Sequence, residues 1–249
     1  MSYPIFKNKH LQEALFNPGD YIKFKRINKK NIPQKIILTY QKHALEYFRT
    51  KYKGRYKILK LYSYDIYKIK NFGFVRLPGI GSPFAVTAFE EFVALGVKEF
   101  INLGTAGGLS HQGIFLCDKA IRDEGTSYHY FPHGMYSYPD KDLTDRFEKS
   151  LIGFGLAPER AATWTIDAPY RETKKEIQRY KNEGVATVEM EASALFAVAK
   201  YRKVKIAAAF VVSDVLGKKW KPMFHYINIK KIQNKMIDAA VECFAGGKK

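Results

Sequence analysis

The chain alternates between stretches of apolar residues and short polar patches, and the longest mainly apolar stretch lies between residues 186 and 217. Apolar side chains occupy nearly every position of 192–199, so a helix formed there would be apolar on both faces, which is typical of a buried helix. Residues 206–212 form a continuous apolar run of strand length, as in a parallel strand covered on both faces. The pattern therefore predicts a buried helix followed by a buried strand.

Two polar patches interrupt this buried unit. Glu189 and Glu191 stand directly before the expected helix, and Ser213 and Asp214 stand directly after the expected strand. Carboxylates beside a buried unit are costly unless they bind something, and ligands of open α/β sheets sit at the carboxyl ends of strands. The patches therefore predict a ligand site. The alternative is that the two glutamates only complement a helix N-terminus and that Asp214 only caps the next turn.

Shorter versions of the same two patterns predict the remaining elements. Strands are expected at 35–40, 58–62, 66–69, 73–77, 100–103, 114–121 and 161–165. Helices are expected at 11–16, 43–48, 85–93, 143–153, 172–182 and 232–244, with an exposed basic segment at 23–35 and a small-residue loop at 104–108. Strands that alternate with helices predict an α/β fold with three layers, α/β/α.

Length and composition fit a single globular domain that spans residues 1–249. The chain is long enough for a substantial core, and its 46% hydrophobic content is ordinary for a globular protein. No run approaches the ~20 apolar residues of a membrane span, and the first residues show no apolar signal region. Cys117 and Cys243 stand in apolar surroundings without metal-ligand spacing, which indicates a reducing compartment. We therefore expect a cytoplasmic protein without a metal site.

The positive charge is concentrated towards the N-terminus. The net charge is +18, and residues 1–70 contain 17 Lys and Arg against 4 Asp and Glu. A basic segment can attract nucleic acid or an anionic surface. The basic residues are mostly lysines mixed with Ile, Tyr and Asn, which also fits a general compositional bias, and no known nucleic-acid motif is present. The sequence therefore does not predict a nucleic-acid-binding protein.

Several blocks, taken together, resemble the nucleoside phosphorylase superfamily of purine nucleoside phosphorylases, uridine phosphorylases and related nucleosidases. The first is VEMEASALFAVA at 188–199, which is followed by VVSD at 211–214. The others are GIGSPFAVTAFEEFVALGVKEFINLGTAGGL at 79–109 and AIRDEGTSYHY at 120–130. The order and spacing of the blocks also match, and the resemblance covers roughly residues 56–244.

This resemblance implies a mixed central sheet that is partly closed into a barrel and flanked by helices, with a divergent basic part at about 1–55. It implies an enzyme that cleaves the N-glycosidic bond of a purine nucleoside, or of uridine, with phosphate as co-substrate and no further cofactor, giving base and ribose 1-phosphate. A nucleosidase that uses water and a catalytically silent nucleoside-binding protein are the alternatives. Family members pair as homodimers, and some of these assemble into hexamers as trimers of dimers.

The resemblance places the ribose at the Glu-Met-Glu motif. Glu191 would accept hydrogen bonds from the ribose hydroxyls, and Met190 would pack against the sugar face. Glu189 would be either a second ribose ligand or a helix N-terminal charge. Asp214 would be the general acid, because bond cleavage leaves negative charge on the departing base, and burial lets a carboxyl group hold a proton near neutral pH. In the family, an Asp that follows Ser at this point accompanies purine chemistry.

Phosphate is expected at the carboxyl end of strand 100–103, where Gly104 offers its backbone and Thr105 its hydroxyl. The family usually has an arginine two residues before this glycine, and this chain has Asn102. The family's Gly-Asp-Pro-x-x-Arg loop is also absent. A third family arginine crosses a dimer interface, and near its position Lys60 is the residue expected to bind phosphate. The missing arginines favour the nucleosidase alternative.

The base is expected at WTIDAPYRET, residues 164–173, which resembles the segment that holds the nucleobase in the family. Tyr170 could stack on the base, and Arg171 could donate to a base carbonyl. The alternative is a loop that is packed by its own Trp and Tyr.

Overall fold

Five strands close into a barrel at the centre of the molecule. The computed structural model describes residues 3–217 and 219–246, which contain an eleven-stranded sheet. The sheet closes because β10 pairs with both β5 and β6, while β8 and β9 complete the ring. The five strands are β5 (Glu99–Gly108), β6 (Ile114–Asp123), β8 (Glu159–Ile166), β9 (Val185–Glu189) and β10 (Lys205–Leu216). The predicted mixed, partly barrel-like sheet is confirmed.

The sheet extends from the barrel on the N-terminal side of β5. Strand β1 lies parallel to β5 and β4, and β3 and β2 then continue antiparallel, close to the strands predicted at 58–62, 66–69 and 73–77. A short strand pairs with β6, and another with the end of β10. These strands are β1 (Lys35–Thr39), β2 (Lys57–Lys60), β3 (Asp65–Ile69), β4 (Phe72–Arg76), β7 (Tyr136–Ser137) and β11 (Trp220–Pro222).

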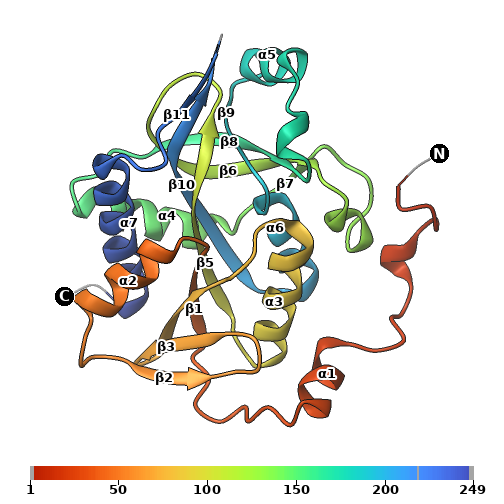
Figure 1. The fold of residues 1–249 in the computed structure, drawn as a ribbon. Helices are drawn as coiled ribbons and strands as arrows, with labels where there is room; N and C mark the ends of the chain where they lie inside the picture. The colour runs from red at the N-terminus through yellow and green to blue at the C-terminus, as the bar shows by residue number, and fades with distance from the viewer. Residues whose placement is uncertain (1–2, 218, 247–249) are drawn as a thin grey trace.

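Helices cover the sheet on two sides, so the predicted three layers are present (Figure 1). One apolar cluster lies between the sheet and α2 (Lys42–Lys51), α4 (Lys141–Gly153) and α7 (Ile227–Ala245). The other lies between the sheet and α3 (Ser82–Ala94) and α6 (Ala192–Arg202). Helix α5 (Lys174–Asn182) packs near β9, and the 3₁₀ turns are η1 (Lys9–Leu11), η2 (Thr126–His129) and η3 (Pro169–Arg171).

The buried unit predicted from the longest apolar stretch is confirmed. Every residue of α6 from Ala192 to Ala199 is buried, and so is β10 from Ile206 to Asp214. Helix α6 lies against β10 and β6. This position explains why α6 is apolar on all sides: the sheet covers one face of the helix, and α3 packs against another.

Two strand ends differ from the prediction. Residues 104–108 are not a loop, because β5 continues through Gly108 and pairs with β10 on one side and β9 on the other. Strand β10 likewise continues past Asp214, after a bulge between Val212 and Asp214. The reason is close packing: a Cβ on Gly108 would lie 2.7 Å from a backbone oxygen and 3.0 Å from a methyl of Val212. The glycines therefore serve the strand pairing rather than a turn.

The N-terminal segment also differs from the prediction. No α-helix forms at 11–16, and the helix lies instead at α1 (Pro18–Phe24), which ends just inside the stretch 23–35 that was expected to be an exposed basic segment. Asn17 and Asp20 form a reciprocal capping box, and Pro18 stands at the first helical position. Local capping chemistry therefore starts α1 at a point where hydrophobic periodicity gives little signal.

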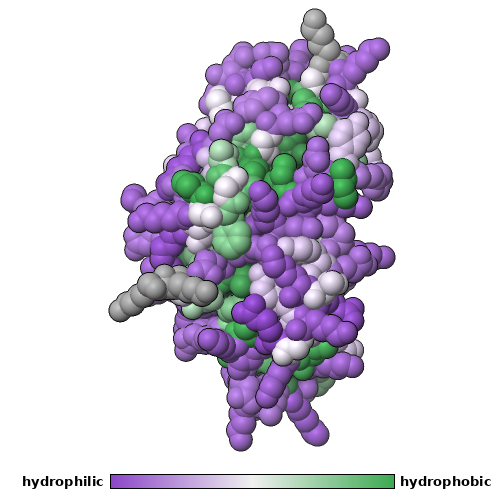
Figure 2. Space-filling view, turned by 90° about the vertical axis from the view of Figure 1, so that its left-hand side faces the viewer, coloured by the Kyte–Doolittle hydropathy of each residue, from purple (hydrophilic) through white to green (hydrophobic). Residues whose placement is uncertain are grey.

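The molecular surface is mainly hydrophilic on the side that carries α2 and α7, where apolar side chains appear in small groups (Figure 2). Throughout residues 3–217 and 219–246, no helix is both long and apolar enough to cross a membrane.

Candidate active site

Glu189 ends β9 and is held by hydrogen bonds on both of its carboxylate oxygens. Its Oε1 accepts a hydrogen bond from the hydroxyl of Thr165. Its Oε2 accepts from the backbone N–H groups of Glu191 and Ala192, at 2.8 and 2.7 Å. These N–H groups belong to the first turn of α6, so Glu189 satisfies donors that the helix itself cannot. This geometry is that of the helix N-terminal charge, one of the two roles considered for this residue.

Glu191 lies where two helices begin. Its Oε1 accepts a hydrogen bond of 2.6 Å from the backbone N–H of Gly81, which has a positive φ of 96° and precedes α3. The hydroxyl of Ser82 donates to the carbonyl oxygen of Met190 at 2.7 Å, so the Glu-Met-Glu turn is fixed to the start of α3 on two sides. Glu191 is buried and Met190 is half-buried. The turn therefore presents a preorganised carboxylate and an adjacent thioether.

Burial raises the pKa of both glutamates. For Glu189 the charge of Glu191 is the second cause that raises the pKa, and hydrogen bonds from Thr165 and from the backbone oppose it. For Glu191 burial dominates, and backbone hydrogen bonds oppose it. Two carboxyl groups this close in a buried place resist double ionisation. The pair therefore favours holding a proton in the neutral pH range.

Asn102 and Tyr40 lie beside this pair, at the position where the resemblance leads one to expect an arginine. The Tyr40 hydroxyl donates to Oδ1 of Asn102 at 2.9 Å, and both side chains are buried. Within the described chain, Nδ2 of Asn102 has no hydrogen-bond partner. Burial and the charges of Glu191 and Glu189 raise the pKa of Tyr40. The site thus offers an uncharged donor where a cation was expected.

Polar side chains also gather around Thr105, three residues after Asn102 on β5. The amide of Gln41 donates to Oγ1 of Thr105 at 3.3 Å, and its Oε1 accepts from the amide of Gln233 of α7 at 2.8 Å. Arg76, half-buried at the end of β4, donates from Nε to the carbonyl oxygen of Tyr40 at 3.2 Å. Among the residues described, no acidic side chain forms an ion pair with Arg76. Its guanidinium is a cation available to an anion near Thr105.

Arg76 was missed in the sequence because it lies outside the positions at which the resemblance expects arginines. The signal was present as a charged residue that ends the buried run of β4. Register places Arg76 opposite Thr39 of β1, and Thr39 in turn opposite Leu103 of β5. Gly104 and Thr105 follow Leu103 directly, so the ends of β4, β1 and β5 bring these residues to one edge.

Lys60 does not lie with the residues at this edge of the sheet. It is exposed at the end of β2, and three strands, β3, β4 and β1, separate β2 from β5 in the sheet. Within one copy of the chain, Lys60 is therefore not brought together with Gly104 and Thr105. Its expected role across a dimer interface stays a prediction.

Asp214 is buried and accepts a hydrogen bond on each carboxylate oxygen. The hydroxyl of Ser213 donates to Oδ1 at 3.0 Å, and the indole Nε1–H of Trp220 donates to Oδ2 at 2.8 Å. Trp220 belongs to β11, which pairs with the end of β10 and places the exposed indole over Asp214. Sequence reasoning missed Trp220, since the contact depends on a hairpin that was not predicted.

The loop after β8 carries the residues expected to hold the base. Tyr170 is fully exposed, and Arg171 is exposed beside it in η3. The half-buried member of the loop is Glu172, which was not predicted to have a role. Burial, and secondly the charge of Asp214, raises the pKa of Glu172 to about 7. Glu172 is therefore the member of this loop whose pKa responds to the charge of Asp214.

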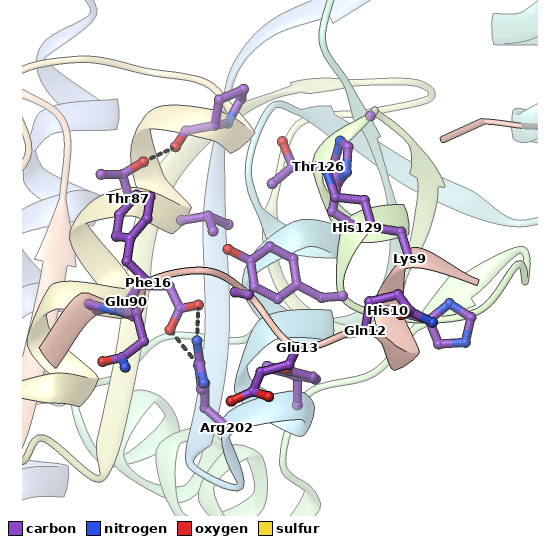
Figure 3. A pocket seen from close by; sticks show the side chains of 18 of the residues that line it. Lys9, His10, Gln12, Glu13, Phe16, Thr87, Glu90, Thr126, His129 and Arg202 are labelled. Atoms are coloured by element: carbon purple, nitrogen blue, oxygen red, sulfur yellow. Dashed lines mark hydrogen bonds and ion pairs between the residues drawn. The ribbon is translucent and has the colours of Figure 1, made fainter. Parts of the chain in front are cut away.

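A separate cavity of about 1220 Å³ lies between the N-terminal segment and the helices α3 and α6 (Figure 3). Its wall includes Arg202, which forms two hydrogen bonds with Glu90, and His129, which bonds to the hydroxyl of Tyr3. None of the predicted site residues lines it. Across the described chain, no group of three His, Cys, Asp or Glu side chains is arranged to hold a metal ion.

The barrel, the Glu-Met-Glu turn and the Ser-Asp pair can be compared with known proteins. A sequence model of the phosphorylase superfamily matches residues 40–244. The chain belongs to the phosphorylase superfamily. This phosphorylase-superfamily protein is 27% identical to a guanosine phosphorylase of Halorubrum lacusprofundi over 142 residues, which is 55% of this chain and 59% of that protein. It spans 54% to 59% of the length of the first curated relatives that it matches.

Two solved structures share the fold of this phosphorylase-superfamily protein. An AMP nucleosidase from Bacteroides thetaiotaomicron superposes with a TM-score of 0.75 at 22% identity, covering 94% of this chain and 100% of that one. A purine nucleoside phosphorylase from Toxoplasma gondii, in complex with immucillin-H, superposes with a TM-score of 0.76 at 17% identity, covering 88% and 92%. These likenesses establish the nucleoside phosphorylase fold.

Proposed function

We propose that this chain cleaves the N-glycosidic bond of a purine nucleoside with phosphate, giving the base and ribose 1-phosphate. One observation carries the proposal. Val188 pairs with Gly107 of β5, and Gly107 pairs with Asp214 of β10, so a single strand separates the Glu-Met-Glu turn from Asp214. Two strand spacings amount to about 10 Å, which suits a nucleoside with its ribose at Glu191 and its base near Asp214.

Gly107 of β5 lies in close contact with both Val188 and Asp214. A Cβ there would lie 3.0 Å from a methyl of Val188 and 3.4 Å from Oδ2 of Asp214. Glycine therefore lets the turn after β9 and the end of β10 approach the same strand closely. The two carboxylates become the two ends of one binding site.

Each group has a role in the reaction. Glu191 accepts hydrogen bonds from the ribose hydroxyls, and the half-buried Met190 packs on the sugar. As the bond to the base breaks, positive charge grows on the sugar and negative charge on the base. Anionic phosphate at Gly104 and Thr105, with Arg76 as its cation, stabilises the sugar charge and attacks C1′. Asp214 acts as the general acid: it protonates the departing base and so neutralises the negative charge.

The nucleobase class rests on the Ser-Asp pair, which accompanies purine chemistry in the family. Curated relatives carry both kinds of name, including guanosine phosphorylase and uridine phosphorylase. The same proposal includes a cytoplasmic homodimer, or a hexamer built as a trimer of dimers. Lys60 would contribute to the phosphate site only across such an interface.

Hydrolysis is the second candidate function, and Asn102 is the observation that favours it. The buried amide of Asn102 can bind the oxygen of a neutral nucleophile but brings no charge to attract dianionic phosphate. A nucleosidase would use water at this point and release free ribose.

One experiment separates these functions. The purified protein is incubated with inosine, guanosine, adenosine and uridine, with and without phosphate, and the sugar product is resolved by chromatography. Ribose 1-phosphate formed only with phosphate, and fastest from the purine nucleosides, supports the proposal. Free ribose formed at the same rate without phosphate supports hydrolysis. Binding of a nucleoside without any cleavage would identify a silent binding protein and contradict both.

A further inference from the structure

A chain of side-chain hydrogen bonds runs from helix α7 to Thr105 of β5. The amide of Gln233, on α7, donates to Oε1 of Gln41 at 2.8 Å. The amide of Gln41, which stands between β1 and α2, donates in turn to Oγ1 of Thr105 at 3.3 Å. Helix α7 packs against β1, β5 and α2, so its side chains reach the strand end that carries Thr105.

The chain of hydrogen bonds has a defined direction. Oε1 of Gln41 accepts two hydrogen bonds, one from Gln233 and one of 3.1 Å from the hydroxyl of Thr39. An amide has its acceptor on one side and its donors on the other, so this double acceptance turns the NH₂ group of Gln41 towards Thr105. Oγ1 of Thr105 therefore accepts, and its single hydroxyl hydrogen is left to donate elsewhere. Among the residues described, no protein group accepts from that hydroxyl.

The burial of Gln233 indicates that its amide has a role beyond packing. The side chain is fully buried, and within the described chain its own Oε1 has no hydrogen-bond partner. A buried amide with an unpaired atom destabilises a fold, whereas an apolar side chain of the same size would fill this place without that penalty. The useful part of the Gln233 amide is therefore the donor that it directs at Gln41.

Thr105 stands at the edge of the sheet where phosphate is proposed to bind. Register places Thr39 of β1 opposite Leu103 of β5, and Gln41 and Thr105 each lie two residues beyond that pair. Both of these side chains are half-buried, so a ligand can reach this end of the hydrogen-bond chain, while Gln233 at the other end is closed off from solvent.

From these contacts we propose that Gln233, acting through Gln41, holds the hydroxyl of Thr105 as a donor aimed at an oxygen of the phosphate. This inference rests on the proposed function and assigns further residues to its phosphate side. Gln41 and Gln233 are positioning residues, since only Thr105 touches the phosphate. An ionised phosphate oxygen accepts hydrogen bonds and cannot donate, so a hydroxyl whose hydrogen is already directed outward binds it better than one that rotates freely.

The test is a double-mutant cycle on the KM for phosphate. Gln233→Met keeps the length of the side chain but removes the donor, and Thr105→Val keeps the shape but removes the hydroxyl. Both single variants and the double variant are compared with wild type. Asn234→Leu is the matched control, because it replaces an amide by an apolar side chain at the next position of α7, outside the hydrogen-bond chain. Initial rates give the KM for phosphate at saturating inosine and the KM for inosine at saturating phosphate.

Thr105→Val should raise the KM for phosphate roughly 10- to 100-fold, because a hydrogen bond to a charged oxygen is lost. Gln233→Met should raise it roughly 3- to 10-fold, as for the loss of one neutral hydrogen bond, and should leave the KM for inosine within ~2-fold of wild type. In the Thr105→Val background, Gln233→Met should not raise the phosphate KM further, because it acts through the hydroxyl. Thr105→Ser restores the hydroxyl and should restore the phosphate KM, and Asn234→Leu should match wild type.

A second variant protects the test against misfolding. Gln41→Met breaks the same chain at a half-buried position, and it should raise the phosphate KM even if Gln233→Met does not fold by circular dichroism and melting temperature. A wild-type phosphate KM in a folded Gln233→Met or Gln41→Met variant would overturn the inference. So would an equal effect of Gln233→Met with and without the Thr105 hydroxyl, which would show a purely structural role.

The wild-type reaction separates this inference from the function on which it rests. Formation of ribose 1-phosphate by wild type, together with an unaltered phosphate KM in the folded variants, would defeat the inference alone. Release of free ribose by wild type at the same rate without phosphate would defeat the proposed function, and the inference with it.

Discussion

Glu189 accepts a hydrogen bond from the backbone N–H of Glu191, at 2.8 Å between Oε2 and N. The first glutamate of the Glu-Met-Glu motif therefore builds the turn in which the second is presented. The two carboxylates are neighbours in sequence and alike in chemistry, but one faces the start of α6 and the other faces the start of α3. Their substitution should therefore have different consequences.

Glu189→Gln should destabilise the fold by about 1–3 kcal/mol, because the amide has a single acceptor oxygen for three donors and leaves buried N–H groups unpaired. Urea denaturation of wild type and variant measures this difference. Glu183→Gln, an exposed change, is the matched control and should stay within about 0.5 kcal/mol of wild type. A Glu189→Gln variant as stable as wild type would show that these hydrogen bonds do not hold the turn.

The raised pKa of Glu189 makes stability depend on pH in a defined direction. Below about pH 4.5 the side chain is protonated in both states. Above this pH the unfolded chain ionises first, so the folded state binds more protons and the free energy of unfolding falls as pH rises through neutrality. Glu191 and Glu172 act in the same direction. Glu189→Gln should therefore reduce this slope without abolishing it, as urea unfolding at about pH 5, 6, 7 and 8 would show. An unchanged slope would contradict the burial of an ionisable Glu189.

Glu191→Gln should leave the fold intact and weaken the use of ribose. Glutamine keeps the acceptor for the Gly81 N–H but loses the charge-assisted hydrogen bonds to two ribose hydroxyls, each worth roughly 1.5–3 kcal/mol. We expect kcat/KM for inosine to fall at least ~10-fold, and to fall less for 2′-deoxyinosine, which has one hydroxyl fewer. Steady-state kinetics on both substrates test this. Equal losses on the two nucleosides would argue that Glu191 does not contact the 2′-hydroxyl.

The sequence predicts the parts of this molecule that depend on local pattern. Helix α6 and strand β10 are visible as apolar runs because burial on all sides leaves no polar face. The continuation of β5 through Gly108 is not visible, because glycines mark a loop and a close strand contact equally well. What decided between them was the approach of Val212 and Val188, which lie far away in sequence.

The candidate site divides in the same way. Glu191 and Asp214 stand beside long apolar runs, so their position alone marks them. No such pattern identifies Arg76, Trp220 or Glu172, because each interacts with a residue that is distant in sequence. Arg76 donates to Tyr40, Trp220 donates to Asp214, and the charge of Asp214 raises the pKa of Glu172. Side chains that act through tertiary contacts need the fold before they can be recognised.

Arg76 supplies the last prediction, which concerns phosphate. If the reaction is phosphorolysis, anionic phosphate near Thr105 needs a cation. Arg76 is half-buried at the end of β4, the strand next to β1, and within the described chain it forms no ion pair with an acidic side chain. Arg76→Gln removes charge-assisted hydrogen bonds worth roughly 1.5–3 kcal/mol, so the KM for phosphate should rise roughly 10- to 100-fold. The KM for inosine should change much less.

Two further variants make this result specific. Arg76→Lys keeps the charge but loses the planar fork, so it should lie between wild type and Arg76→Gln. Lys70→Gln, an exposed change near the same strand, should leave the phosphate KM unaltered and controls for the loss of one positive charge at long range. Initial rates at a saturating inosine concentration, with phosphate varied, measure all three. A phosphate KM that is the same in Arg76→Gln as in wild type would remove Arg76 from the site. If Lys60→Gln then raised that KM in an oligomer, the cation would come from a neighbouring copy of the chain instead.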